Sequence, residues 1–266
     1  MERSGSTIPD ALRGAAVVTG AGRGIGRAIA LALAAEGATV FAVARTRETL
    51  ERVAREARTT GATIVPLPCD VSVEADVRRV AAAVAERSTA LRVLVNAAAL
   101  RMHQLGDPEA FRTPVLELSV DEWDRVVAAD LRGPFLCCRY LGPLLTGAGG
   151  ASVVNFSARA AVRPDAGRAP YAASKAGLDA LTRTLALEWG DARVAVNSLD
   201  PGARVITEDH RAGARAKEPG VRYVTPEAMV PPTLYLARGT VTGQRIDAMA
   251  WNAANGFGGP DRWEAR

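Results

Sequence analysis

The sequence predicts a single-domain α/β protein built on a doubly wound parallel sheet. Short runs rich in Val and Ile alternate with longer Ala- and Leu-rich segments of helical period, and such alternation indicates βαβ units. A glycine-rich turn follows the first of these runs, where a sheet of this kind binds a ligand. The 266 residues of the chain fit one such sheet, since α/β units of this size are routinely a single domain.

The expected elements follow one another from the N-terminal end. Strands are expected at 15–20, 39–44, 63–70, 91–99, 151–157 and 193–202. Helices are expected at 27–37, 46–61, 73–88, 121–141 and 171–190. Gly37, Gly61 and Gly190 close three of these helices, where a left-handed cap favours glycine. Right-handed crossovers between parallel strands then give the doubly wound arrangement.

Composition limits the core and the partners of the chain. Hydrophobic residues make up 48% of the chain but aromatic residues only 5%, so Ala, Val, Leu and Ile must fill the core. The net charge of +4 comes with Arg spread along helices rather than gathered in one run. No nucleic-acid surface is therefore expected, and an anionic cofactor accounts equally well for the basic excess.

The cysteines and the N-terminal segment favour a reducing compartment. The spacing of the three cysteines, two of which are adjacent, matches neither a disulfide framework nor a zinc site, so no metal site is expected. The N-terminal segment is polar, and no run of 18 apolar residues appears. The expectation is a cytoplasmic protein without a membrane partner.

The glycine-rich turn predicts a phosphate-binding loop. It reads TGAGRGIG over 19–26, between an expected strand and an expected helix. Glycines let the backbone approach a pyrophosphate, and the helix N-terminus offers free N–H groups. The segment resembles the T-G-x-x-x-G-I-G motif of the short-chain dehydrogenase/reductase family, which implies a Rossmann-like fold. The expected cofactor contacts in this segment are Thr19, Gly20, Arg23, Gly24, Ile25 and Gly26.

The end of the second expected strand predicts a preference for NADP(H). Family members that prefer NAD have an acidic residue at this place, where this chain has Ala44 followed by Arg45. No carboxylate repels a 2'-phosphate here, and Arg45 with Arg23 can form charge-assisted hydrogen bonds to it. The alternative is that both arginines are merely solvated, but their joint placement favours NADP(H).

The resemblance covers roughly residues 12–250 and implies further cofactor contacts. Asp70 and Val71 match a D-V pair near the adenine. Asn96 begins a segment similar to the family's N-N-A-G, and Pro201-Gly202 matches the P-G pair beside the nicotinamide. The segment 241–248 resembles the last strand of the family's sheet.

A tyrosine and a lysine four residues apart are the expected catalytic centre. Tyr171 and Lys175 lie on one face of an expected helix and match the family's Y-x-x-x-K pattern. A free phenol has a pKa of about 10, and the positive charge of Lys175 would lower it. The resemblance implies that Tyr171 exchanges a proton with a carbonyl oxygen, while Lys175 also binds the nicotinamide ribose.

Two residues depart from the family's catalytic pattern. An ungapped alignment places Ala158 where the family has its serine, with Ser157 one residue earlier. Ser157 can replace that serine only if the strand end is shifted, because adjacent side chains on a strand point to opposite faces. Asp130 stands in place of the family's asparagine, where it can hold a water, pair with Lys175 or serve a purely structural purpose.

Two C-terminal regions have less regular patterns. The segment 203–224 is charged and poor in apolar residues, which predicts a substrate loop or lid. The tail 251–266 carries aromatic and glycine residues. Three roles remain open for it, which are to cover the substrate, to contact a second subunit or to close the core of its own subunit. The resemblance implies a homodimer or homotetramer assembled through long helices.

The favoured function is the NADP(H)-dependent reduction of a ketone or aldehyde, or oxidation of the alcohol, of a small molecule. Ala158 and Asp130 motivate two alternatives. One is a non-redox enzyme of the same fold, such as a cyclase, dehydratase or isomerase. The other is a protein that binds NADP(H) without turnover, and the fold alone does not choose among the three.

Overall fold

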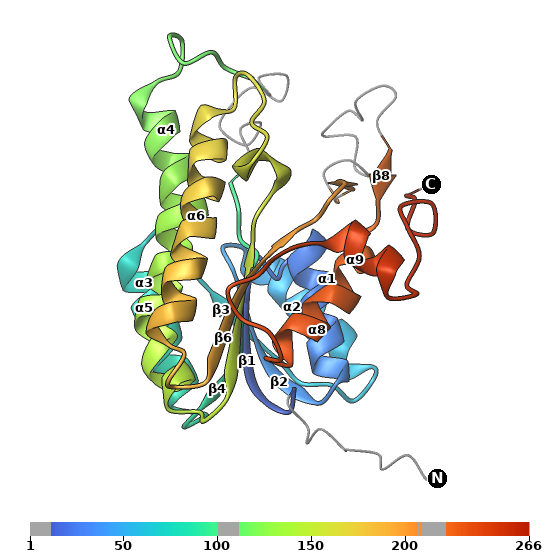
Figure 1. Ribbon diagram of the computed structural model, residues 1–266. Helices are drawn as coiled ribbons and strands as arrows, with labels where there is room; N and C mark the ends of the chain where they lie inside the picture. The colour runs from blue at the N-terminus through green and yellow to red at the C-terminus, as the bar shows by residue number, and fades with distance from the viewer. Residues whose placement is uncertain (1–11, 101–111, 207, 209–221, 266) are drawn as a thin grey trace.

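A seven-stranded parallel sheet forms the centre of the molecule (Figure 1). The computed structural model describes residues 12–100, 112–206, 208 and 222–265. The strand order is β3-β2-β1-β4-β5-β6-β9, with every neighbouring pair parallel. The strands are β1 (Gly14–Thr19), β2 (Ala38–Ala44), β3 (Ile64–Pro68), β4 (Leu91–Asn96), β5 (Ala151–Phe156), β6 (Val194–Asp200) and β9 (Arg245–Asp247). Because the chain leaves β1 first toward β3 and then toward β9, the predicted doubly wound, single-domain fold is confirmed.

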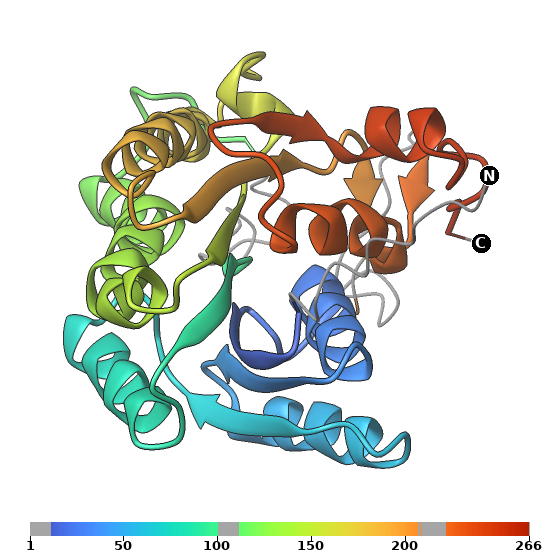
Figure 2. The same cartoon turned by 60° about the horizontal axis from the view of Figure 1, so that its bottom comes forward.

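Helices cover both faces of the sheet (Figure 2). One face carries α1 (Gly24–Ala35), α2 (Arg47–Arg58), α8 (Val230–Ala237) and α9 (Ala248–Ala254). The other face carries α3 (Glu74–Ala85), α4 (Val120–Val127), α5 (Gly133–Thr146) and α6 (Ala169–Glu188). No helix in these described ranges is long and apolar enough to cross a membrane.

Alternation along the central strands divides the core into two layers. Ala16 and Val18 of β1 belong to the cluster under α1 and α8, whereas Ala15 and Val17 belong to the cluster under α3 and α5. A strand covered on both faces has no polar side, which explains its continuous apolar run. Aliphatic side chains, mainly of Ala, Val and Leu, fill most of this space, and Phe41 of β2 is a fully buried aromatic residue.

The expected helix 121–141 is interrupted by a π-helical segment, η2 (Ala128–Arg132), between α4 and α5. Pro134 has no N–H, so it cannot donate to the carbonyl of Asp130, four residues earlier. The N–H of Gly133 donates to the carbonyl of Ala128, five residues earlier, which is the spacing of a π-helix. Such wide turns are frequent at functional sites. This one carries Asp130.

The prediction of a left-handed glycine after the helix is correct for two of the three helices. Gly37 and Gly61 have φ angles of 93° and 76°. Gly190 does not have a positive φ, and the left-handed residue after α6 is Arg193, with φ 56°. The turn after α6 therefore places its left-handed residue three positions later than predicted.

The C-terminal tail returns to a short second sheet formed by β7 (Arg204–Val205) and β8 (Tyr223–Val224). Thr225 donates a backbone hydrogen bond to Trp263, and Ala265 donates one to Tyr223. The tail thus packs on its own subunit. Most of the predicted lid 203–224 lies outside the described residues, between these two strands.

Candidate active site

The loop between β1 and α1 is built by close backbone packing. A Cβ on Gly26 would lie 2.3 Å from the carbonyl oxygen of Gly20, so no larger residue fits without a shift. Gly20 and Gly24 have φ angles of 69° and 51°, which favour glycine. Thr19 is buried, and its Oγ1 accepts hydrogen bonds from Ala97 and Ala98 at 3.0 and 3.1 Å. Thr19 therefore fixes the loop after β4.

The N-terminus of α1 holds a carboxylate. The backbone N–H of Gly24 donates to both carboxylate oxygens of Glu208, at 3.1 and 2.9 Å. A helix N-terminus favours anions through its free N–H groups and its dipole. The donors at this end of α1 therefore fit an anionic group such as a pyrophosphate, which would take the place of the Glu208 carboxylate.

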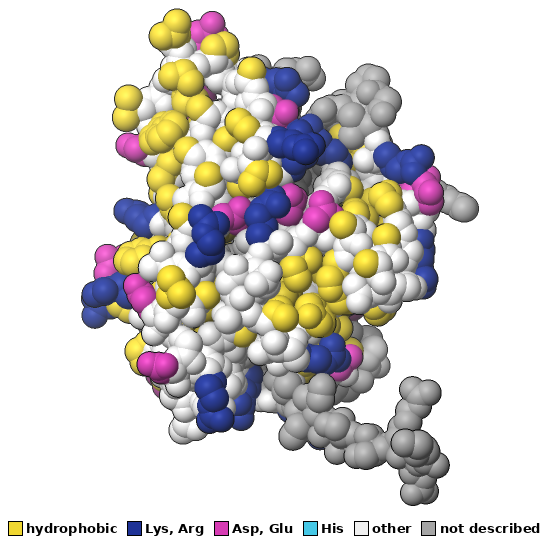
Figure 3. All heavy atoms as spheres, viewed as in Figure 1, with side chains coloured by type: hydrophobic (Ala, Val, Ile, Leu, Met, Phe, Trp, Pro, Cys, Tyr) yellow, Lys and Arg dark blue, Asp and Glu magenta, His cyan; other side chains and the backbone are white. Residues whose placement is uncertain are grey.

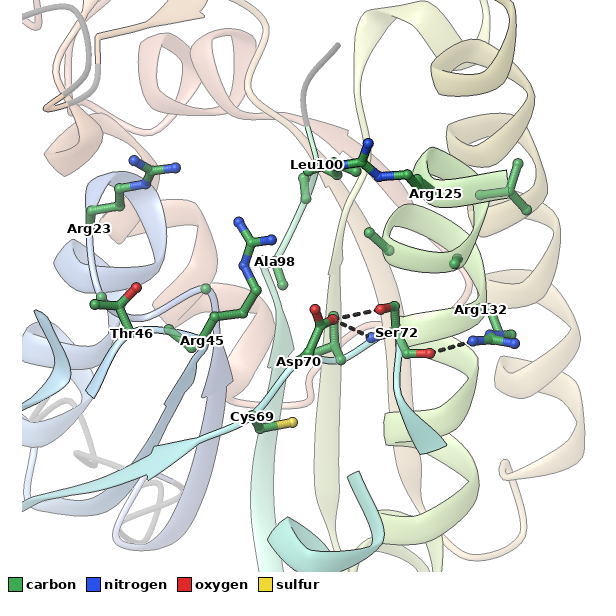
Figure 4. A pocket seen from close by; sticks show the side chains of 18 of the residues that line it. Arg23, Arg45, Thr46, Cys69, Asp70, Ser72, Ala98, Leu100, Arg125 and Arg132 are labelled. Atoms are coloured by element: carbon green, nitrogen blue, oxygen red, sulfur yellow. Dashed lines mark hydrogen bonds between the residues drawn. The ribbon is translucent and has the colours of Figure 1, made fainter. Parts of the chain in front are cut away.

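A cavity of about 870 Å³ lies beside this loop. It extends from Gly20 and Arg23 past Ala44 and Arg45 to Asp70, Val71 and Ala98. Figure 4 shows Arg23 and Arg45 together on one side of the cavity, opposite Arg125 and Arg132. Asp70 is oriented by Ser72, whose N–H and Oγ donate to it at 2.9 and 2.6 Å. The volume, the arginines and the glycine loop fit the phosphate-bearing part of a dinucleotide.

A thiol at the floor of this cavity is chemically inert. Cys69 lines the cavity but is only 4% exposed. Burial raises its pKa to about 12, with a smaller contribution in the same direction from Asp76. Because the thiolate is the reactive form, Cys69 contributes volume and not nucleophilic chemistry.

A second cavity, of about 300 Å³, contains the expected catalytic residues. Tyr171 and Lys175 line it with Ile25, Ser157, Pro201 and Gly202. Ala99 lines both cavities, so the two adjoin. Asn96 lines neither of them, because its side chain is buried and donates to Asn155 at 2.8 Å.

Lys175 is held in a buried polar setting. Its Nζ donates to the carbonyl oxygen of Phe156 at 3.0 Å and lies 5.7 Å from the centre of the Tyr171 ring. Its Nζ also lies 3.5 Å from Oδ2 of Asp130, with side-chain exposures of 3% and 0%. The other oxygen, Oδ1, accepts from the N–H of Leu100 at 2.6 Å. Of the alternatives that the sequence left open for Asp130, pairing with Lys175 is the one observed.

The strand end at Ser157 is not shifted. The N–H of Ser157 donates to Leu199 at 2.9 Å and continues the ladder between β5 and β6. Its Oγ is buried without a hydrogen-bond partner among the described residues. The condition under which Ser157 would replace the missing serine at position 158 is therefore not met.

Sequence reasoning missed a polar network behind Ala158. Arg245 of β9 donates to the Ala158 carbonyl at 3.1 Å, to Asp200 at 2.6 Å and to Asp179 at 3.0 Å. The network links the ends of β5, β6 and β9 with α6. No spacing along the chain could have paired these residues, since they come from elements 45 or more positions away from Arg245.

Known proteins are similar to this chain over most of its length. Residues 14–217 match the family model described as short chain dehydrogenase. D-threitol dehydrogenase of Mycolicibacterium smegmatis is 34% identical over 229 residues, which cover 84% of this chain and 85% of the relative.

Two solved structures are similar over most of their length. A putative NAD(P)-dependent gluconate 5-dehydrogenase from Beutenbergia cavernae, solved with NADP at low occupancy, has a TM-score of 0.76 and 32% identity, covering 88% of this chain and 94% of that one. A variant of actinorhodin polyketide ketoreductase with NADPH has a TM-score of 0.77 and 29% identity, covering 89% and 96%.

Proposed function

This chain belongs to the short-chain dehydrogenase family, and on that premise we propose that it is an NADP(H)-dependent oxidoreductase. Its proposed substrate is the ketone or aldehyde of a small organic molecule, or the corresponding alcohol. The observation that carries the proposal is that Tyr171 and Lys175 line a small cavity adjoining one that fits a dinucleotide. Relatives named dehydrogenases and reductases support the class of reaction.

Residues of the second cavity transfer the proton that reduction of a carbonyl requires. NADPH, when bound, supplies a hydride to the carbonyl carbon of the substrate. Tyr171 donates its phenolic proton to the carbonyl oxygen as the alcohol forms, and it accepts that proton in the reverse direction. The ammonium of Lys175 stabilises the resulting phenolate, while Phe156 and Asp130 fix its position.

Asp130 gives the surroundings of Lys175 a negative charge that the family's asparagine at this position would not supply. The carboxylate of Asp130 offsets part of the field that Lys175 exerts on Tyr171. It also accepts from Leu100, so the same group holds the segment after β4. Asp130 is in this proposal a positioning residue, and we assign no step to Ser157.

NADP(H) is the proposed cofactor rather than NAD(H). Support comes from Arg23 and Arg45, which line the larger cavity, and from Ala44, which leaves the end of β2 without a carboxylate. Guanidinium groups bind a phosphate through charge-assisted hydrogen bonds. Solved relatives that contain NADP or NADPH agree with this preference.

A homo-oligomer is the proposed assembly. Exposed hydrophobic side chains include Val120 and Trp123 of α4, Phe135 of α5 and Leu187 of α6. These helices cover one face of the sheet, and Figure 3 shows hydrophobic side chains over the upper part of α4 and α6. Such groups favour contact with a second copy of the chain.

The test of this function is the oxidation of NADPH with a panel of ketones and aldehydes, followed at the nicotinamide absorbance. We expect Tyr171→Phe to lower kcat by about 10²- to 10⁴-fold, since a positioned general acid contributes this much. Tyr235→Phe is the matched control, because it removes one phenol from α8, away from both cavities. Equal activity of the Tyr171→Phe variant and the wild type would contradict the proposal.

A non-redox reaction is the second candidate. The observations in its favour are the methyl group at Ala158, which removes a hydroxyl from the cavity, and the ion pair that partly neutralises Lys175. The same assay separates the two functions, because a cyclase, dehydratase or isomerase forms product without net consumption of NADPH.

A further inference from the structure

One arginine on the edge strand β9 joins three segments that form the second cavity. β9 pairs with β6 at the edge of the sheet (Figure 2). Nη2 of Arg245 donates to the carbonyl oxygen of Ala158 at 3.1 Å and to Oδ2 of Asp200 at 2.6 Å. Its Nε donates to Oδ2 of Asp179 on α6 at 3.0 Å. Ala158 and Asp200 line the cavity and Arg245 does not, so the guanidinium group lies behind the wall.

The contact with Asp200 extends to the turn after β6. Oδ2 of Asp200 accepts from Arg245, and Oδ1 accepts from the N–H of Gly202 at 3.1 Å. The turn is closely packed, because Gly202 has a φ of 68° and a Cβ there would overlap with the carboxylate of Asp247. Pro201 and Gly202 both line the second cavity. Arg245 thus fixes the position of this turn through Asp200.

The segment after β5 is held by two cations from different elements. Lys175 of α6 donates to the carbonyl of Phe156, and Arg245 of β9 donates to that of Ala158, two residues later. The methyl group of Ala158 cannot form a hydrogen bond with a substrate. At this position it is therefore the backbone, held from outside the cavity, that has a defined polar contact.

Asp179 connects the same guanidinium group to the helix that carries the proton donor. It follows Lys175 by four residues on α6, so the two side chains lie on one side of the helix. The side chains of Asp179 and Asp200 are each 6% exposed, and that of Arg245 is 26% exposed. Carboxylates buried this deeply need a positive partner. The planar guanidinium group serves both, through different nitrogen atoms.

We propose that Arg245 is a positioning residue, which holds the turn at Gly202 and the backbone at Ala158 in the geometry that hydride transfer requires. The inference rests on the proposed function, in which the nicotinamide end of the cofactor lies at this turn. None of the three hydrogen-bond partners named for Arg245 lines the larger cavity. Loss of Arg245 should therefore affect the nicotinamide end of the cofactor and leave the adenosine end in place.

The decisive experiment compares two ligands that fill different parts of the proposed cofactor site. Adenosine 2',5'-bisphosphate has no nicotinamide half, so it tests the larger cavity alone, whereas NADPH also tests the second cavity. We expect Arg245→Ala to raise the Kd of NADPH about tenfold, or about 1.4 kcal/mol, and to leave the Kd of the bisphosphate unchanged. Isothermal titration calorimetry measures both. An unchanged Kd for NADPH, or an equal rise for the two ligands, overturns the proposal.

Turnover gives a second measure of the same effect. A displacement of about 1 Å at the reacting atoms costs about 100-fold in rate, so we expect Arg245→Ala to lower kcat for carbonyl reduction by about that factor. Guanidinium chloride, added well below the concentrations that unfold proteins, fits the space that the side chain leaves and should restore part of kcat. Ammonium chloride at the same concentration should not. Equal restoration by both salts would show that charge alone suffices and would overturn the geometric argument.

Arg245→Lys tests the proposal even if Arg245→Ala does not fold. It keeps a positive charge beside Asp179 and Asp200, but its single nitrogen cannot occupy the positions of Nε and Nη2 together. We expect the same selective loss of NADPH affinity. Arg238→Ala is the matched control, because Arg238 forms an ion pair with Glu36 at the surface and lines neither cavity. It should leave kcat and both Kd values unchanged.

The two kinds of measurement separate this inference from the proposed function. If no carbonyl is reduced but Arg245→Ala selectively weakens NADPH binding, the redox function is wrong and the role of Arg245 at the nicotinamide end is right. If carbonyls are reduced and both Arg245 variants retain the kcat and the NADPH affinity of the wild type, the redox function is right and the role of Arg245 is wrong.

Discussion

A buried carboxylate beside the catalytic lysine sets the energetics of the active site at the scale of single residues. Asp130 and Lys175 are 0% and 3% exposed, and the carboxylate of Asp130 compensates the buried charge of Lys175. Removing one partner of a buried pair leaves an uncompensated charge and costs about 3–5 kcal/mol. We therefore expect Asp130→Ala to lower the free energy of unfolding by about that amount, which urea denaturation measures.

The exposed pair of Asp121 and Arg125 on α4 is the matched control. Its side chains are 78% and 46% exposed and 3.8 Å apart, and exposed pairs contribute about 0–1 kcal/mol. Asp121→Ala should therefore have a small effect. If both substitutions cost the same, the pair of Asp130 and Lys175 does not stabilise the fold as a buried ion pair.

The positions of functional residues were predictable where these residues lie close together along the sequence. Tyr171 and Lys175 share a helix face because they are four positions apart, and the structure places both in one cavity. Arg245, in contrast, acts through residues of three other elements. Its contacts depend on tertiary packing, which leaves no periodic signal in the sequence.

Among the helices and strands, the alternation of short Val- and Ile-rich runs with longer Ala- and Leu-rich segments was sufficient to predict the strands β1 to β6 and the helices between them. Each lies within a few residues of its expected range. The π-helical segment η2, the helix α8 and the pair β7 and β8 were not predicted. The first depends on one missing N–H at Pro134, and two-residue strands such as β7 and β8 are too short for a period to appear.

The turn from β1 into α1 has no room for a side chain at position 26. A methyl group on Gly26 would lie 2.3 Å from the Gly20 oxygen, so the loop and the first turn of α1 must separate. We expect Gly26→Ala to destabilise the protein by about 1–3 kcal/mol, as overpacking does, and to weaken NADPH binding more than tenfold. Urea denaturation and NADPH titration measure the two effects.

Gly259→Ala is the matched control for this substitution. A Cβ there meets nothing within 4 Å, and Gly259 does not have a positive φ. Stability and NADPH affinity should both remain close to those of the wild type. NADPH affinity that survives Gly26→Ala would show that the close approach of Gly20 and Gly26 is not needed for the cofactor.

For the whole molecule, cofactor binding and stability are linked. The larger cavity joins the segments that follow β1, β3 and β4 with the end of β2 and with α4, so a bound dinucleotide stabilises these parts of the fold together. A ligand at 100 times its Kd adds about 2.7 kcal/mol to the free energy of unfolding. In a chain of this size that corresponds to a rise in Tm of about 5–10 °C.

The same linkage tests the choice between NADP(H) and NAD(H). At equal concentrations NADPH should raise Tm more than NADH, because Arg23 and Arg45 line the cavity and no carboxylate ends β2. Arg45→Asp places a negative charge at that position, so it should lower the rise with NADPH and increase the rise with NADH. Arg47→Asp makes the same charge change outside the cavity, on an arginine whose side chain is 63% exposed, and should leave the order of the two cofactors unchanged. An unchanged order in Arg45→Asp, or the same reversal in Arg47→Asp, would contradict a specific phosphate contact and leave only the general charge of the protein as the cause.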